Sequence, residues 1–152
     1  MMSKVGVVDS SCLIGLWKIG QIHLLQQLFA RVVVPDSVQQ ESDIFLDWFE
    51  VRSPQNEQLV LSLCAYLGKG ESDVMAPGVE IGECEVLLDD RKARKTAGYL
   101  GLKVVGTVGI LLRAKRQGYL THVKPFGDRL TSEGFCVSQE IYTKALEIAG
   151  EA

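Results

Sequence analysis

Short apolar runs alternate along the chain with segments whose apolar residues recur at helical spacing. The runs rich in β-branched residues predict strands, at residues 5–8, 31–35, 84–90 and 102–106. The helical segments are 10–16, 21–29, 36–49, 57–67, one that begins within 68–73, then 91–101, 107–118, 124–134 and a last one after Ser138. Strands that alternate with helices predict an α/β fold with a mainly parallel central sheet.

Polar residues and prolines predict where several of these helices begin or break. Ser10 or Ser11 is expected to cap the first helix, and Ser37 with Gln40 fits a capping box for the third. The pair Pro77-Gly78 is expected to interrupt or kink the helix that begins near residue 70, because proline lacks the N–H of a helical hydrogen bond.

Length and composition favour one compact domain over residues 1–152. The chain is 47% hydrophobic, enough to build a sizeable core. Its longest apolar stretches fall short of the roughly 20 residues that span a bilayer, so we expect a cytoplasmic protein without a membrane partner. Four scattered cysteines without a C-x-x-C pair predict buried, reduced thiols.

Charge is strongly segregated along the sequence. Residues 36–90 carry 13 Asp and Glu against 2 Lys and Arg, whereas residues 91–129 carry 10 Lys and Arg against one Asp. This distribution suits carboxylates that hold cations beside a basic face that attracts a polyanion. Two solvated surfaces that neutralise each other would produce the same pattern.

Acidic residues follow two of the predicted strands. Asp9 follows the first strand, and Asp89-Asp90 follow the third. Ligands bind at the carboxyl edge of a parallel sheet, where Glu41 and Asp73, near the starts of two helices, are also within reach. Carboxylates that converge there would repel one another unless Mg²⁺ or Mn²⁺ lay between them. Each has a plain alternative: helix capping or first-turn charge for the aspartates, and an ordinary surface position for Glu41.

Five blocks carry a resemblance to a known family. In order, they are "VVDSSCLIGL", "VVVPDSVQQE", "GESDVMAPGVEIGECEVLLDDRKAR", "GLKVVGTVGILLRAKRQGYL" and "GFCVSQEIYTKALEIAGE". They resemble PIN-domain proteins related to VapC toxins, and more narrowly a prokaryotic subfamily long labelled as a domain of unknown function. The resemblance implies a PIN-like three-layer α/β/α sandwich and a Mg²⁺- or Mn²⁺-dependent ribonuclease, often the toxin of a toxin-antitoxin pair.

The resemblance also assigns roles to residues. The implied catalytic and metal-binding acids are Asp9, Glu41, Asp73 and Asp89, with Asp90 as the competitor of Asp89. Hydroxyls behind this site would be Ser10, Ser11 and Thr107, the last either for packing or for support. The cations that follow the strand-end acids would bring the RNA backbone to the metal, and they are Arg91, Lys92, Arg94 and Lys95.

Two other functions compete with this one. "MAPGVEIG" stands where the subfamily has an uninterrupted helix rich in alanine and leucine. A kink at Pro77 would point Asp73 away from the site and leave a module that binds an antitoxin or RNA without cleaving it. An aspartate-based phosphotransferase also places an acid after the first strand. It needs further acids at set positions, such as a second Asp two residues after the first, where this chain has Ser11. By analogy, the expected partners are an RNA substrate, a small antitoxin and a second copy of the chain in a homodimer.

Overall fold

The computed structural model describes residues 5–65, 67 and 69–152. Five strands within these ranges form one parallel sheet in the order β3-β2-β1-β4-β5. The strands are β1 (Val5–Val8), β2 (Arg31–Pro35), β3 (Phe49–Arg52), β4 (Glu85–Leu87) and β5 (Lys103–Val105). The helices are α1 (Ser10–Lys18), α2 (His23–Leu28), α3 (Asp36–Ser42), α4 (Glu57–Cys64), α5 (Lys69–Ile81), α6 (Arg91–Tyr99), α7 (Thr107–Arg116), α8 (Lys124–Ser132) and α9 (Gln139–Ala149).

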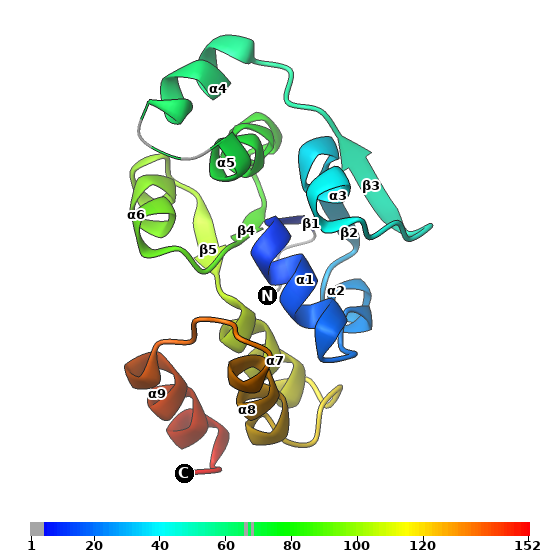
Figure 1. The fold of residues 1–152 in the computed structure, drawn as a ribbon, viewed down its shortest axis with the longest axis vertical. Coiled ribbons are helices and arrows are strands. Elements are labelled where there is room, and N and C mark those ends of the chain that lie inside the picture. Colours follow the sequence, from blue (N-terminus) through cyan, green and yellow to red (C-terminus); the bar gives the residue numbers. More distant parts are fainter. Residues whose placement is uncertain (1–4, 66, 68) are drawn as a thin grey trace.

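The expected α/β/α architecture is confirmed. In Figure 1, α4 and α5 lie on one side of the strands, and α7, α8 and α9 lie on the other. Strand β1 is central, and its residues Val7 and Val8 are fully buried. The near-continuous apolar strands β1, β2 and β4 are typical of a parallel sheet that is covered on both faces. Within the described ranges, no helix is long and apolar enough to cross a membrane.

The helix predicted over 36–49 is wrong in its second half. Helix α3 ends at Ser42, and Asp43 takes a left-handed conformation with φ 58°. Phe49 then begins the edge strand β3, which pairs in parallel with β2. The apolar spacing that looked helical instead reflects packing after the turn, where Ile44 is buried and the rings of Trp48 and Phe49 meet edge to face at 4.8 Å. Pairing with β2 supplies backbone hydrogen bonds that a surface loop would lack.

Helix α5 continues through the proline that was expected to interrupt it. It runs from Lys69 to Ile81 with Pro77 inside. The next residue packs closely on the sheet, because a Cβ built on Gly78 would lie only 3.1 Å from Cγ2 of Val86 in β4. The helix therefore presses its backbone against the sheet at this point. Gly82, with φ 85°, follows the last turn, and its N–H donates to the carbonyl of Gly78.

Two of the expected helix caps are also wrong. Asp9, rather than Ser10 or Ser11, is the N-cap of α1. The residue before α3 is Pro35, which provides no side-chain cap, so the capping box of Ser37 does not form. Ser138 caps α9.

The prediction of buried cysteines holds for Cys12 and Cys84, but Cys64 and Cys136 are exposed, and all four are free thiols.

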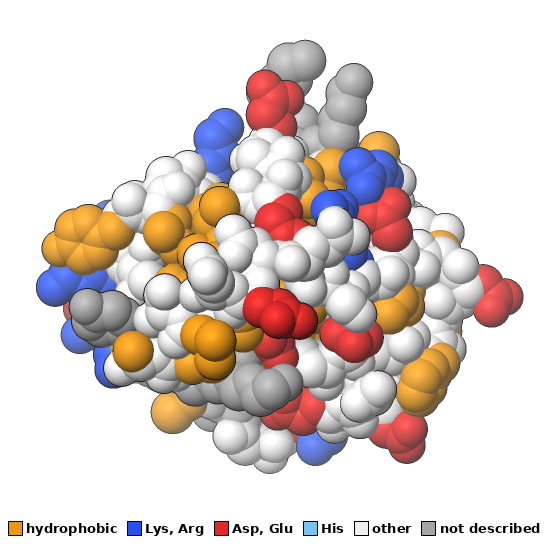
Figure 2. All heavy atoms as spheres, turned by 90° about the horizontal axis from the view of Figure 1, so that it is seen from above, with side chains coloured by type: hydrophobic (Ala, Val, Ile, Leu, Met, Phe, Trp, Pro, Cys, Tyr) orange, Lys and Arg blue, Asp and Glu red, His pale blue; other side chains and the backbone are white. Residues whose placement is uncertain are grey.

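The charge segregation of the sequence is visible on the surface. Figure 2 looks down on the side of the molecule that carries α4 and α5. Asp and Glu side chains lie across the middle of this face, and a group of Lys and Arg side chains lies at the edge where Figure 1 places α6. The two charge types therefore occupy neighbouring surfaces.

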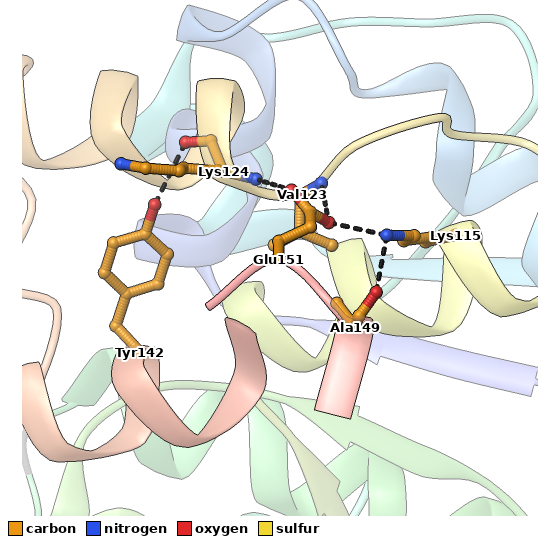
Figure 3. A network of polar contacts seen from close by, with 6 residues as sticks. All are labelled: Lys115, Val123, Lys124, Tyr142, Ala149 and Glu151. Atoms are coloured by element: carbon orange, nitrogen blue, oxygen red, sulfur yellow. Dashed lines mark hydrogen bonds and ion pairs between the residues drawn. The ribbon is translucent and has the colours of Figure 1, made fainter. Parts of the chain in front are cut away.

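The carboxylate of Glu151 joins the last residues of the chain to two helices (Figure 3). It accepts hydrogen bonds from the backbone N–H groups of Val123 and Lys124 at the start of α8, at 2.8 and 2.9 Å, and from Nζ of Lys115 in α7, at 2.9 Å. Nζ of Lys115 also donates to the carbonyl of Ala149. Burial alone would raise the pKa of Glu151, but these donors lower it to about 2.

This network predicts a pH dependence of folding. The pKa of Glu151 is lower in the folded protein than its ordinary value of 4.5. The stability that it contributes is therefore present above pH 4.5 and is lost as the pH falls toward 2. We expect wild type to be more stable than Glu151→Gln at pH 7, with a smaller difference at pH 3, in urea unfolding experiments.

The matched control is Glu147→Gln, because Glu147 is an exposed acid on α9, the helix that precedes Glu151. It should change stability little at either pH. Equal differences between wild type and Glu151→Gln at pH 7 and pH 3 would contradict this account of the network.

Candidate active site

Asp9 is a buried carboxylate at the carboxyl end of the central strand. Its side chain is 7% exposed and accepts a hydrogen bond of 2.8 Å from the backbone N–H of Ser10. Burial raises the pKa of Asp9 to about 6, against the lowering effect of that hydrogen bond, and the negative charges of Glu71, Glu41 and Asp89 raise it further. Among the described residues, the side-chain charges that act on Asp9 are thus all negative. Such a site favours a cation.

The three acids that raise the pKa of Asp9 come from three different elements. Glu41 is on α3, Glu71 is in the first turn of α5, and Asp89 follows β4. Glu41 and Asp89 are among the acids predicted from the sequence, whereas Glu71 is not. One signal in the sequence pointed to it, because "GES" places an acid where a helix begins and where the positive end of the helix dipole favours an anion.

Asp73 occupies a different position from the one expected. Helix α5 begins at Lys69, so Asp73 lies beyond its first turn rather than at its start. Two residues correspond to about 200° of rotation, which places Asp73 on the opposite face of the helix from Glu71. Asp73 is 4% exposed, and its charge is not among those that raise the pKa of Asp9. A catalytic role for Asp73 stays a prediction.

The structure separates the two neighbouring acids Asp89 and Asp90. Asp89 accepts hydrogen bonds from the backbone N–H of Thr107, at 2.9 Å, and from its hydroxyl, at 2.7 Å. Asp90 instead caps α6, where it accepts from the N–H of Ala93 at 3.2 Å. Asp89 is therefore the acid that acts on Asp9, and Asp90 has the capping role that was its plain alternative.

Thr107 holds the carboxylate of Asp89 from behind. Its Oγ1 also lies 3.2 Å from Sγ of Cys12, a fully buried residue of α1. Gly106 completes this support, because a Cβ there would lie 2.6 Å from Oδ1 of Asp89. Of the two alternatives for Thr107, the contacts favour site support. Of the two serines, Ser10 is buried with its N–H bonded to Asp9, and Ser11 is exposed.

The predicted RNA-binding cations lie on α6, directly after the acids. Arg91, Lys92 and Lys95 are exposed. Arg94 is half-buried, and its Nη1 lies 3.6 Å from where a Cβ on Gly106 would stand, on the same side of the backbone as Asp89. A basic helix therefore starts at the acidic edge of the sheet.

The acids around Asp9 suit a divalent cation in chemistry and charge. Carboxylate oxygens are the ligands that Mg²⁺ and Mn²⁺ prefer, and Mg²⁺ commonly binds through one or two of them while keeping several waters. Among the residues that the structure describes, no three His, Cys, Asp or Glu side chains stand close enough to hold one ion between them. The donor set thus fits such an ion, while the side chains do not form a closed cage.

Comparison with protein families decides the assignment. A family model described as a PIN domain matches residues 5–151. The chain belongs to the PIN-domain family. PIN domains are generally nucleases, and they typically use divalent metal ions. Comparison with curated proteins finds no match. The nuclease-type fold of the family agrees with acids gathered at the carboxyl edge of its parallel sheet.

The buried charge of Asp9 predicts that its neutralisation stabilises the metal-free PIN domain. Because the pKa of Asp9 rises from 3.8 to about 6 on folding, stability is lost as the pH increases through this range. Asp9→Asn has no such charge and keeps a good N-cap. Urea unfolding in EDTA should show Asp9→Asn more stable than wild type by roughly 3 kcal/mol at pH 8.

At pH 4 most of this gain should disappear, since wild-type Asp9 is then largely protonated. If the difference in unfolding free energy between Asp9→Asn and wild type were the same at pH 8 and pH 4, the raised pKa of Asp9 would be refuted. Asp47→Asn, at an exposed loop position, serves as the control and should show no such trend.

Proposed function

We propose that this PIN domain is a Mg²⁺- or Mn²⁺-dependent endoribonuclease that hydrolyses RNA phosphodiesters. The observation that carries the proposal is the buried Asp9, whose pKa is raised by burial and by three further carboxylates. Placing four negative groups around a buried position is unfavourable for folding unless a bound cation compensates. A ribonuclease that uses metal ions has this requirement.

In this proposal the metal-binding acids are Asp9, Glu41, Glu71 and Asp89, of which one or two bind an ion directly and the others bind through its waters. Glu71 takes the place first given to Asp73, because it is the acid of α5 whose charge acts on Asp9. When bound, Mg²⁺ or Mn²⁺ activates a water molecule and neutralises charge on the phosphodiester. Thr107 keeps the Asp89 carboxylate oriented through its two hydrogen bonds.

The basic side chains of α6 bind the substrate in this proposal. Arg91, Lys92 and Lys95 are exposed at the start of the helix that follows Asp89-Asp90, where they contact phosphates. Arg94, beside Asp89, is near enough to the acids to bind a phosphate that reaches them. Single-stranded or loop RNA suits such an open edge better than a duplex, since its backbone enters freely.

The proposal extends to regulation as the toxin of a VapC-like toxin-antitoxin pair. Support comes from the resemblance of the sequence blocks and from the charge of the site. A small antitoxin with a basic or hydrophobic segment would neutralise the acids and cover the edge of the sheet. A homodimer in the cytoplasm belongs to the same proposal.

Cleavage of an RNA pool tests the enzymatic proposal. Wild type should cut with Mn²⁺ or Mg²⁺ and stop with EDTA. Asp9→Asn and Glu71→Gln should each reduce the cleavage rate about 100-fold or more. Replacing a residue that only hydrogen-bonds to a metal ligand already reduces metal affinity or activity about 10- to 100-fold. Asp73→Asn should retain more activity than Glu71→Gln, because Glu71, in the first turn of α5, is an acid whose charge raises the pKa of Asp9.

Asp47→Asn, at an exposed acid before the amino end of β3 and so away from the carboxyl ends of the strands, should keep wild-type activity. If Asp73→Asn is inactive and Glu71→Gln is active, Asp73 is the acid of α5 that binds the metal, and the role proposed for Glu71 is wrong. If a folded wild-type protein binds RNA or an antitoxin but cuts no RNA with either metal, the binding-module alternative replaces the enzyme.

A further inference from the structure

Helix α6 presents a stripe of cations that ends in an exposed aromatic ring. Arg91, Lys95 and Tyr99 follow one another at four-residue spacing, and Lys92 flanks them. Residues at this spacing lie on the same side of a helix. Tyr99 is 81% exposed, the highest value among the exposed large hydrophobic side chains of the described residues. A ring left open to this extent has much of its surface available to a ligand.

These four side chains make no ion pair or hydrogen bond with other described residues, in contrast to several cations elsewhere in the chain. Arg113 forms two hydrogen bonds with Glu85, Lys115 bonds to Glu151, and Lys124 pairs with Asp128. The charge of the α6 stripe is therefore not neutralised by neighbouring carboxylates. It is available to a polyanion.

The stripe lies beside the acids of the proposed nuclease site. Helix α6 begins directly after Asp89-Asp90, and it runs about 12 Å from Arg91 to Tyr99 at 1.5 Å per residue. That length corresponds to three or four stacked nucleotides at about 3.4 Å each. In Figure 2, Lys and Arg side chains lie at the edge where Figure 1 places α6, on the same face as the acidic middle, with hydrophobic and uncharged side chains between the two.

We propose that a single RNA strand lies along α6, with its phosphates on Arg91, Lys92 and Lys95 and one base stacked on Tyr99. A basic track combined with an aromatic platform is how proteins bind single strands without reading sequence, because every base has a flat face. The inference rests on the proposed ribonuclease function and adds a base-stacking subsite to it. Tyr99 is a binding residue in this account and takes no part in the chemical step.

Binding of a fluorescent 12-nucleotide RNA in EDTA tests the subsite apart from cleavage. By fluorescence anisotropy, Tyr99→Ala should bind about fivefold or more weakly than wild type, within the range that stacking contributes per base. Tyr99→Trp should restore binding. Tyr119→Ala is the matched control, because Tyr119 is also an exposed tyrosine, 44% exposed and beyond the end of α7, and should bind as wild type.

An abasic strand of the same length separates stacking from charge. Wild type and Tyr99→Ala should bind it equally, whereas Lys95→Ala should weaken both ligands and reduce the dependence on salt concentration. Equal RNA binding by wild type and Tyr99→Ala overturns the subsite. So does a Tyr99→Ala variant with normal RNA affinity that no longer self-associates in size-exclusion chromatography, since the ring then serves a protein interface.

The outcomes also separate the subsite from the proposed function. If wild type binds RNA through Tyr99 but cuts none with Mn²⁺ or Mg²⁺, the subsite stands and the ribonuclease proposal fails. If wild type cuts RNA with metal and Tyr99→Ala cuts and binds equally well, the ribonuclease stands and the subsite is wrong. If wild type neither binds nor cuts RNA, both are wrong.

Discussion

The structure depends on keeping one carboxylate buried at the end of its central strand. Asp9 lies between β1 and α1. Its N–H donates to the carbonyl of Leu87 in the neighbouring strand β4, and its side chain caps α1. Backbone bonds on the sheet thus fix its position. Burial and neighbouring negative charges oppose its ionisation, so the fold retains an unfavourable charge instead of neutralising it with an arginine or lysine. Such a cost is typical of functional sites.

The rest of the molecule holds the other acids around this position. Asp89 is oriented by Thr107, the first residue of α7, and Thr107 also contacts Cys12 in α1. Helix α7 is tied to β4 by the two hydrogen bonds of Arg113 to Glu85. The contacts of Glu151 hold the same helix to the end of the chain. Packing far from the acids therefore determines where one of them points.

Much of this arrangement was predictable from the sequence. Four of the five described strands carry β-branched runs, and acids that follow strands at the carboxyl edge of a parallel sheet identify Asp9 and Asp89. The edge strand β3 was missed because Ile44 and Phe49 mimic helical spacing, while the chain turns at Asp43. Only the pairing with β2 reveals the strand, and pairing is a tertiary interaction that local spacing does not show.

Helix α5 shows why the remaining part of the site was harder to predict. Choosing between Glu71 and Asp73 requires the start of the helix, and a shift of two residues reverses the face on which an acid lies. Pro77 suggested an interruption, but the helix is continuous through it and packs closely on β4 at Gly78. Propensity describes a helix in isolation, whereas packing against the sheet decided this one.

The most direct test of the central claim is the titration of the Asp9 carboxyl group, followed by NMR with carbon-13-labelled aspartate and assigned with Asp9→Asn. Without metal, the account predicts a pKa near 6. With saturating Mg²⁺, it predicts a pKa well below this value, because a bound cation favours the carboxylate. A carboxyl group that titrates near 3.8 in both conditions would contradict the account, since Asp9 would then need no cation.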